Sequence, residues 1–171
     1  MKHSVDKSDL RPPERRALKT LTTTKLAAIL DVALGELGLR GFTVEVSFVP
    51  DGKIRRLNLS QRGKDKATDV LSFPMFEAKN GKVKLAAWER ALPEKVLGSI
   101  VIAMGVAQRQ AKEMGHTLSA EVTRLLVHGV CHLAGYDHER SPREEKLMFL
   151  REDRILAAVA KARGKDAGSR A

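Results

Sequence analysis

The sequence is poor in cysteine, in aromatic residues and in long apolar runs. Its single cysteine, Cys131, excludes an intrachain disulfide and fits a reducing compartment such as the cytoplasm. Aromatic residues make up 4% of the chain, which disfavours a broad base-stacking platform. No run approaches the roughly 18 apolar residues of a membrane span, and the charged N-terminal residues precede no apolar stretch typical of a signal peptide. We therefore expect a soluble, cytoplasmic protein.

The chain does have an excess of positive charge. Thirty-one Lys and Arg residues against 21 Asp and Glu residues give a formal net charge of +10. This excess indicates a polyanionic partner, with nucleic acid as the first candidate and a membrane surface as the second. The 171 residues suit one domain, predicted at 14–163. Residues 1–13 lack a hydrophobic period and are predicted to form a flexible basic arm, and residues 164–171 a frayed tail.

The hydrophobic pattern predicts an α+β fold, in which a single small mixed sheet of about four strands is covered by about five helices. Strands are predicted at residues 42–49, 68–74, 82–87 and 97–104. Helices are predicted at residues 14–38, around 54–59, and at 105–115, 118–134 and 142–163.

Three of the five histidines lie in the stretch HGVCHLAGYDH, residues 128–138. On the predicted helix 118–134, His128 and His132 are one turn apart on one face, a spacing that lets two imidazoles bind one ion. Gly135 follows three residues later and can adopt the left-handed conformation that ends a helix and reverses the chain. This reversal can bring His138 back as a third ligand. We therefore expect a metal site at the end of the helix.

Three neutral imidazoles suit one Zn²⁺ ion per chain and leave its fourth coordination position open for water. That arrangement is typical of a catalytic site, where the ion lowers the pKa of bound water to about 7 and attracts anions. The competing interpretation is that these histidines are ordinary core or surface residues that fall together by chance. Three of them at this spacing favour the metal site.

The histidine spacing also matches the zinc-protease pattern H-E-x-x-H-x-x-G-x-x-H, with one decisive difference. Gly129 stands where the protease has its glutamate, so a peptidase would lack its general base. Cys131 is interpreted as core filler and not as a ligand. Asp137 and Glu139 flank the third histidine, where either can orient a ligand, act as a base or be a solvated surface acid. Asp137 is the candidate catalytic carboxylate.

A second segment, DGKIRRLNLSQRGKDK at residues 51–66, contains six basic and two acidic residues. Such a run is often a solvated helix face, but it directly precedes an apolar strand, so a phosphate-contacting surface is equally consistent with it. The stretch LNLSQRGKDKATDVLSFP, followed by LGSIVI, GHT and HGVCHLAGYDH in this order, resembles the YbeY family of bacterial endoribonucleases and rRNA maturation factors. The resemblance covers residues 40–160.

The resemblance implies a zinc-dependent endoribonuclease that acts on single-stranded RNA, matures the 3′ end of 16S rRNA and serves ribosome quality control. It places His128, His132 and His138 on the metal ligands of the family and Arg62 on its important basic residue. A guanidinium at Arg62 can clamp the scissile phosphate and stabilise transition-state charge, the alternative being a plain surface charge. The implied partners are rRNA and the ribosome or its small subunit, with neither DNA nor a membrane among them.

Three positions depart from the family pattern. Gln61 replaces the usual tyrosine, Ala67 the usual proline, and Ser99 the usual acidic residue. The last change removes a carboxylate that could partner Arg62 or a ligand histidine. Two other functions stay open: a non-catalytic rRNA-binding assembly factor with a structural zinc, and a metallohydrolase of peptides or small molecules.

Overall fold

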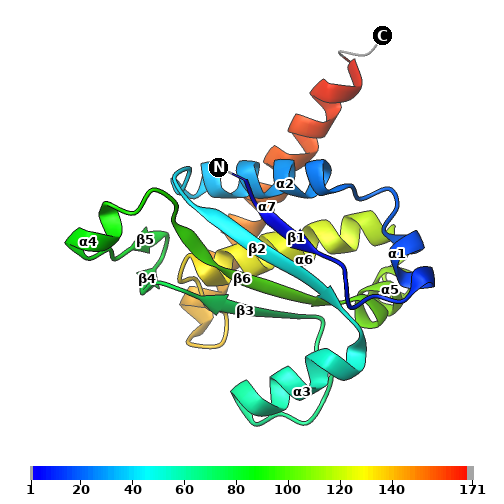
Figure 1. Cartoon of the computed structure of the whole chain (residues 1–171). Helices are drawn as coiled ribbons and strands as arrows, with labels where there is room; N and C mark the ends of the chain where they lie inside the picture. The colour runs from blue at the N-terminus through cyan, green and yellow to red at the C-terminus, as the bar shows by residue number, and fades with distance from the viewer. Residues whose placement is uncertain (1, 169–171) are drawn as a thin grey trace.

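The computed structural model describes residues 2–168, with side chains described through residue 164. Its centre is a four-stranded sheet with the order β1-β2-β6-β3 (Figure 1). These strands are β1 (Ser4–Asp6), β2 (Thr43–Val49), β6 (Val96–Ala103) and β3 (Val70–Pro74). The first three run parallel, and β3 runs antiparallel to β6 at the edge. The prediction of a small mixed sheet is confirmed.

Helices lie on both faces of this sheet. α2 (Thr23–Glu36), α6 (Leu118–Leu133) and α7 (Pro142–Gly168) pack together on one face, and α3 (Asp51–Arg62) lies on the other side (Figure 1). The remaining elements are α1 (Pro12–Ala17), α4 (Ala87–Arg90), α5 (Met104–Glu113) and the hairpin of β4 (Ala78–Lys79) and β5 (Lys82–Val83). The α+β prediction is confirmed, with seven helices in the described part of the chain where about five are predicted. None of the helices within residues 2–168 has both the length and the apolar character needed to cross a bilayer.

The central strand β6 divides the core into two parts. Ile100 and Ile102 face the large cluster formed with α2, α6 and α7, whereas Val101 and Ala103 face a smaller cluster that includes Ile54 of α3. Successive strand residues point to opposite faces, so a strand covered on both sides is apolar throughout. This explains the uninterrupted run at residues 100–104 and places α3 and α6 on opposite sides of the sheet.

The prediction that residues 1–13 form a flexible arm is wrong for the segment from His3 onward. Ser4–Asp6 pair with β2, and the His3 side chain is only 4% exposed. The Nδ1 atom of His3 accepts a hydrogen bond from the Val44 N–H (3.0 Å), and its Nε2 atom lies 3.1 Å from Asp31 Oδ1. Leu10 is also buried. A three-residue edge strand is too short to show the alternation by which strands are found in a sequence.

Three element boundaries also differ from the predictions. The helix predicted at 14–38 is two helices, because the Thr22 side chain accepts from the Lys25 N–H and begins α2 anew. The strand predicted at 82–87 is reduced to Lys82–Val83. α7 continues to Gly168, through part of the tail predicted to fray at 164–171, and residues 169–171 lie outside the described residues.

Candidate metal centre in a charged cleft

Two of the predicted ligands project from the last turns of α6. The helix begins where the Thr117 side chain accepts a hydrogen bond from the Ala120 N–H (3.1 Å), as expected of a threonine cap. Its buried stripe packs on the sheet, and His128 and His132 lie half-buried at the edge of that stripe. Their Nε2 atoms are 3.1 Å apart. The helix therefore aims two ring nitrogens at one point.

The chain reversal at Gly135 supplies the third ring. Gly135 has φ +81°, the left-handed conformation predicted for it. The ring centroid of His138 lies 5.3 Å from that of His128 and 5.2 Å from that of His132. The turn is seated on the β4–β5 hairpin, where the Asn80 and Gly81 N–H groups donate to the backbone oxygens of residues 135 and 134. A Cβ at position 135 would overlap the backbone of residue 78, so the seat requires glycine.

The three rings have the geometry of a metal-binding tripod. One nitrogen from each of His128, His132 and His138 lies within 4.8 Å of the others. Tetrahedral Zn–N bonds of about 2.0–2.1 Å separate two ligand nitrogens by roughly 3.3 Å, close to the 3.1 Å found between the first two. The donor set therefore can hold one divalent metal ion.

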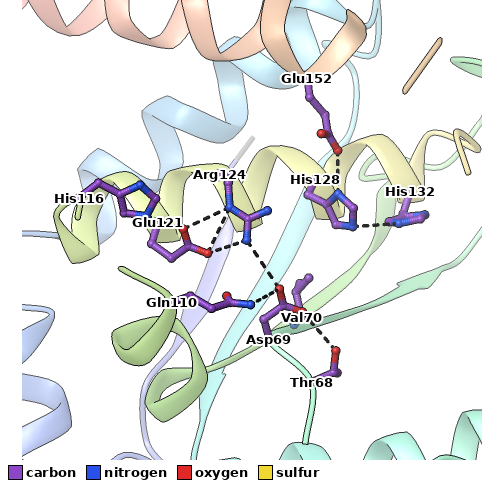
Figure 2. A network of polar contacts seen from close by, with 10 residues as sticks. All are labelled: Thr68, Asp69, Val70, Gln110, His116, Glu121, Arg124, His128, His132 and Glu152. Atoms are coloured by element: carbon purple, nitrogen blue, oxygen red, sulfur yellow. Dashed lines mark hydrogen bonds and ion pairs between the residues drawn. The ribbon is translucent and has the colours of Figure 1, made fainter. Parts of the chain in front are cut away.

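A carboxylate behind the tripod fixes the orientation of one ligand. Glu152 of α7 places Oε1 2.7 Å from His128 Nδ1, on the side of the ring opposite the tripod (Figure 2). An Nδ1–H donated to a carboxylate leaves Nε2 free to bind metal and raises its basicity. Sequence reasoning missed Glu152, because it lies 24 residues beyond its partner on a helix with many other acids.

Burial prepares His132 for metal binding. Removal from water, with smaller contributions from the neighbouring rings of His128 and His138, lowers the pKa of His132 from 6.5 to about 4. A buried imidazolium is costly because its charge is poorly solvated. The ring is therefore neutral at neutral pH, the form that binds a metal.

The tripod lies on the wall of a cleft with a volume of about 500 Å³. Besides the three histidines, its lining carries three arginines and three carboxylates: Arg62, Arg124, Arg140, Asp69, Asp137 and Glu139. These formal charges cancel. A divalent ion on the tripod would thus make the cleft net positive and suited to an anion.

Arg62, the predicted basic residue, reaches this cleft from the end of α3. Gly63, with φ +66°, ends the helix immediately after it. The guanidinium donates to both carboxylate oxygens of Glu139, at 3.0 and 2.8 Å. This contact with Arg62 lowers the pKa of Glu139. Glu139 is therefore the partner of Arg62 and does not orient a histidine.

Asp137, the candidate catalytic carboxylate, also lines the cleft. Its Oδ1 accepts from the Glu139 N–H (2.9 Å), and its Oδ2 lies 3.0 Å from Arg140 Nε. These contacts hold the turn that carries His138. Asp137 thus lies where the sequence predicts it, next to the tripod but tied into its turn.

Two other residues of the motif face away from the cleft. A Cβ on Gly129 would lie 2.8 Å from Ile100 Cδ1, so this position packs against β6. A glutamate there could not reach the cleft without displacing the sheet, which strengthens the argument against a peptidase. Cys131 is fully buried in the large core, and burial raises its pKa to about 12. Its interpretation as core filler is confirmed.

Although Ser99 replaces the acid usual in the family, Arg62 and His128 both have a carboxylate partner. Ser99 donates to Glu45 on the neighbouring strand (2.7 Å). Arg62 and His128 instead use Glu139 and Glu152. The carboxylates come from elements that the departure at Ser99 does not touch.

The first half of α6 carries a second polar network that sequence reasoning missed. Glu121, fully buried, accepts from Arg124 and lies 2.7 Å from His116 Nε2 (Figure 2). Arg124 also approaches Asp69 at 3.6 Å, and Asp69 accepts from the Gln110 amide. A possible signal was the spacing of Glu121, Arg124 and His128 on one helix face, but the contact with Asp69 joins residues 55 apart.

Comparison with known proteins agrees with this geometry. Residues 13–160 match the family model described as endoribonuclease YbeY. The protein of that name from Aquifex aeolicus is 44% identical over 138 residues, which cover 81% of this chain and 84% of the relative. The Sulfurihydrogenibium protein of that name is 38% identical over 156 residues, covering 91% and 95%. The solution structure of TM1509 from Thermotoga maritima superposes with a TM-score of 0.59 at 26% identity, covering 96% of this chain and 93% of the other. The chain belongs to the endoribonuclease YbeY family.

Proposed function

We propose that this protein is a metal-dependent endoribonuclease that cleaves single-stranded RNA, with one Zn²⁺ held by His128, His132 and His138. The observation that carries the proposal is the convergence of three imidazole nitrogens within 4.8 Å on the wall of a cleft that also contains Arg62. Relatives named endoribonuclease support RNA as the substrate class. When bound there, Zn²⁺ would supply a Lewis acid and lower the pKa of a water molecule to about 7.

Arg62 is the residue proposed to bind the scissile phosphate. Its planar guanidinium can donate two parallel hydrogen bonds to phosphate oxygens and stabilise the charge that grows in the transition state. A phosphate must first replace Glu139. Exposed ion pairs contribute only about 0–1 kcal/mol, and both side chains of this pair are at least 40% exposed. The exchange therefore costs little.

Asp137 is the proposed proton acceptor for an attacking water. A carboxylate offers about four lone-pair sites, and the two contacts made by Asp137 leave capacity for a further donor. The Glu139 N–H and Arg140 hold the carboxylate in place at the cleft. Arg140 thereby positions Asp137, while Asp137 accepts the proton.

The proposed biological substrate is the 3′ end of 16S rRNA, in ribosome maturation and quality control in the cytoplasm. The net charge of +10 supports binding to RNA longer than the cleft. On α3, the helix that delivers Arg62, Arg55 and Arg56 are exposed, whereas Lys53 is half-buried. Lys53 pairs with Asp9 and Arg55 with Asp65, so Arg56 is the residue of the three that extends the positive surface away from the cleft. We propose the small ribosomal subunit as the partner on the same grounds.

A chelation experiment tests this function. Purified protein is stripped with a chelator, and cleavage of a single-stranded oligoribonucleotide with the 16S 3′-end sequence is followed before and after addition of Zn²⁺, Ni²⁺ or Mn²⁺. We expect activity to disappear with the metal and return with it, and the same strand in a duplex or as DNA to be spared. Cleavage that persists in the stripped protein would contradict the metal mechanism. RNA binding without cleavage under every metal would instead favour a non-catalytic assembly factor.

A further inference from the structure

Arg124 lies on the same face of α6 as the first two metal ligands. Arg124, His128 and His132 are spaced by four residues, so each lies one helical turn from the next. Arg124 lines the same cleft as the tripod, and 35% of its side chain is exposed. Its position is therefore open to a ligand that occupies the tripod.

Two carboxylates, those of Glu121 and Asp69, hold the guanidinium of Arg124 in place. Its Nε and Nη2 atoms donate to fully buried Glu121, at 3.2 and 2.6 Å, and Glu121 is held in turn by His116. Nη2 also lies 3.6 Å from Asp69, whose carboxylate accepts from the Val70 N–H. An arginine fixed in this way loses little conformational entropy when it binds a further group.

One nitrogen of Arg124 is left free by these contacts. Nη1 has no hydrogen-bond partner among the side chains described, those of residues 2–164, and Figure 2 shows it pointing along α6 toward His128. A purely structural arginine that ties α6 to β3 needs only the edge that faces Glu121 and Asp69. The free edge, exposed to the cleft, is the part available to a phosphate oxygen.

The two arginines approach the tripod from different ends. Arg62 is held by Glu139, the neighbour of His138, whereas Arg124 precedes His128 by one turn. A single phosphate at the metal can meet Arg62, and the next phosphate along a strand would meet Arg124. We propose that Arg124 forms a second phosphate subsite, which binds a phosphate adjacent to the scissile one in a single-stranded RNA. This proposal rests on the proposed function and adds that the minimal good substrate has two consecutive phosphodiesters.

The test compares substrates that differ by one charge. A dinucleotide with a single phosphodiester is compared with longer strands in which the phosphate 5′ or 3′ to the cleaved bond is replaced by a neutral methylphosphonate. For the wild type, we expect one of these replacements to lower kcat/KM about 10-fold, mainly through KM, as the loss of one charge-assisted hydrogen bond would. If both methylphosphonate strands were cleaved with the same kcat/KM as the unmodified strand, the proposal would be overturned.

A matched variant assigns the effect to Arg124. Removal of Arg124 alone would leave fully buried Glu121 with only His116 as its partner. The variant is therefore Glu121→Gln/Arg124→Met, with folding checked by circular dichroism and metal content. It should lose the sensitivity to the methylphosphonate and cleave the dinucleotide like the wild type. The control Arg109→Met removes an arginine that pairs with Asp51 outside the cleft and should behave as the wild type. Equal losses on dinucleotide and longer strand would show that Arg124 only supports the tripod.

Binding measurements separate this proposal from the proposed function. If no preparation cleaves RNA, the function fails, but the affinity of the same oligonucleotides can still be measured. The double variant should then bind more weakly with a salt slope reduced by about 0.7, the value for one phosphate on a single strand. An unchanged slope, with the methylphosphonate effect intact, would overturn the second subsite.

Discussion

Both ends of α6 have a histidine bonded to a carboxylate, but the start forms a polar network and the end forms a potential metal site. Near its start, Glu121 contacts both His116 and Arg124, and Arg124 also approaches Asp69. Near its end, the ring nitrogens of the tripod converge on one another, and among the residues that the structure describes only His128 has a carboxylate hydrogen-bonded to its other nitrogen. A histidine bonded to a carboxylate is therefore no sign of a metal site by itself. What indicates a metal site is that the other ring nitrogen of His128 lies close to ring nitrogens of further histidines in a cleft.

The largest effect is expected when one histidine of the tripod is removed, because this tests directly whether the end of α6 binds a metal. His132→Ala should lower metal affinity by more than about 100-fold, the upper end of what loss of an outer partner costs, and RNA cleavage should fall with it. The matched control is His3→Gln, which removes a histidine bonded to Asp31 far from the cleft. Metal content is measured by mass spectrometry after dialysis. Equal metal content in the two variants would refute the tripod.

The neutral state of His132 predicts a pH effect on the metal-free protein. The unfolded chain takes up a proton on this ring near pH 6.5, whereas the folded protein resists it until about pH 4. Between these values the unfolded state binds more protons, so the free energy of unfolding falls as the pH drops, by about 3 kcal/mol in total. Denaturation at pH 7, 6, 5 and 4 measures it. His132→Asn should flatten this part of the profile, and an unaltered profile would contradict the prediction.

The carboxylates behind the two histidines should differ in their effect on metal. Glu152→Gln weakens the support of a ligand, so we expect a 10- to 100-fold loss of metal affinity, as is typical of outer partners. Glu121→Gln changes the hydrogen-bond partner of His116, which is not part of the potential metal-binding group found among the described residues, and should leave metal affinity unchanged. Competition with a chromogenic chelator compares the two. Similar losses would mean that the halves of α6 are coupled more tightly than their contacts indicate.

The smallest effect is expected at the Arg62–Glu139 ion pair, which lines the cleft and is more exposed than either Glu121 or His128. Glu139→Gln removes a competitor for the guanidinium and should tighten RNA binding by up to about 5-fold, the equivalent of 1 kcal/mol. Arg62→Lys, which loses the forked donor, should weaken it. Fluorescence anisotropy at fixed salt measures both. Weaker binding by Glu139→Gln would indicate that Glu139 positions Arg62 for the phosphate.

The parts of the site that residue spacing alone could predict are those whose partners are close along the chain, whereas Arg62 was found through the family resemblance. His128, His132, Gly135 and His138 fall within eleven residues, and helical periodicity together with one left-handed glycine suffices to bring them together. Glu152 could not be assigned in this way, because its pairing depends on how α7 packs on α6.

The same limit applies to the fold. β6 was predictable because burial on both faces makes it apolar throughout. β1 was not, because three residues carry no measurable period and their stability comes from pairing with β2 and from the buried side chain of His3. The contact between Arg124 and Asp69 was missed for a related reason. Asp69 directly precedes β3, and no local sequence pattern joins it to α6.

The seat of Gly135 on the β4–β5 hairpin has a consequence for how the protein would acquire a metal ion. The reversal that carries the third imidazole is anchored by backbone hydrogen bonds to residues 80 and 81, none of which involves a metal. We therefore expect folding alone to bring the three rings together, unlike in a zinc finger, which orders only around its ion. Capture of the metal should be fast and nearly free of conformational rearrangement, and exchange of one ion for another should leave the backbone unmoved.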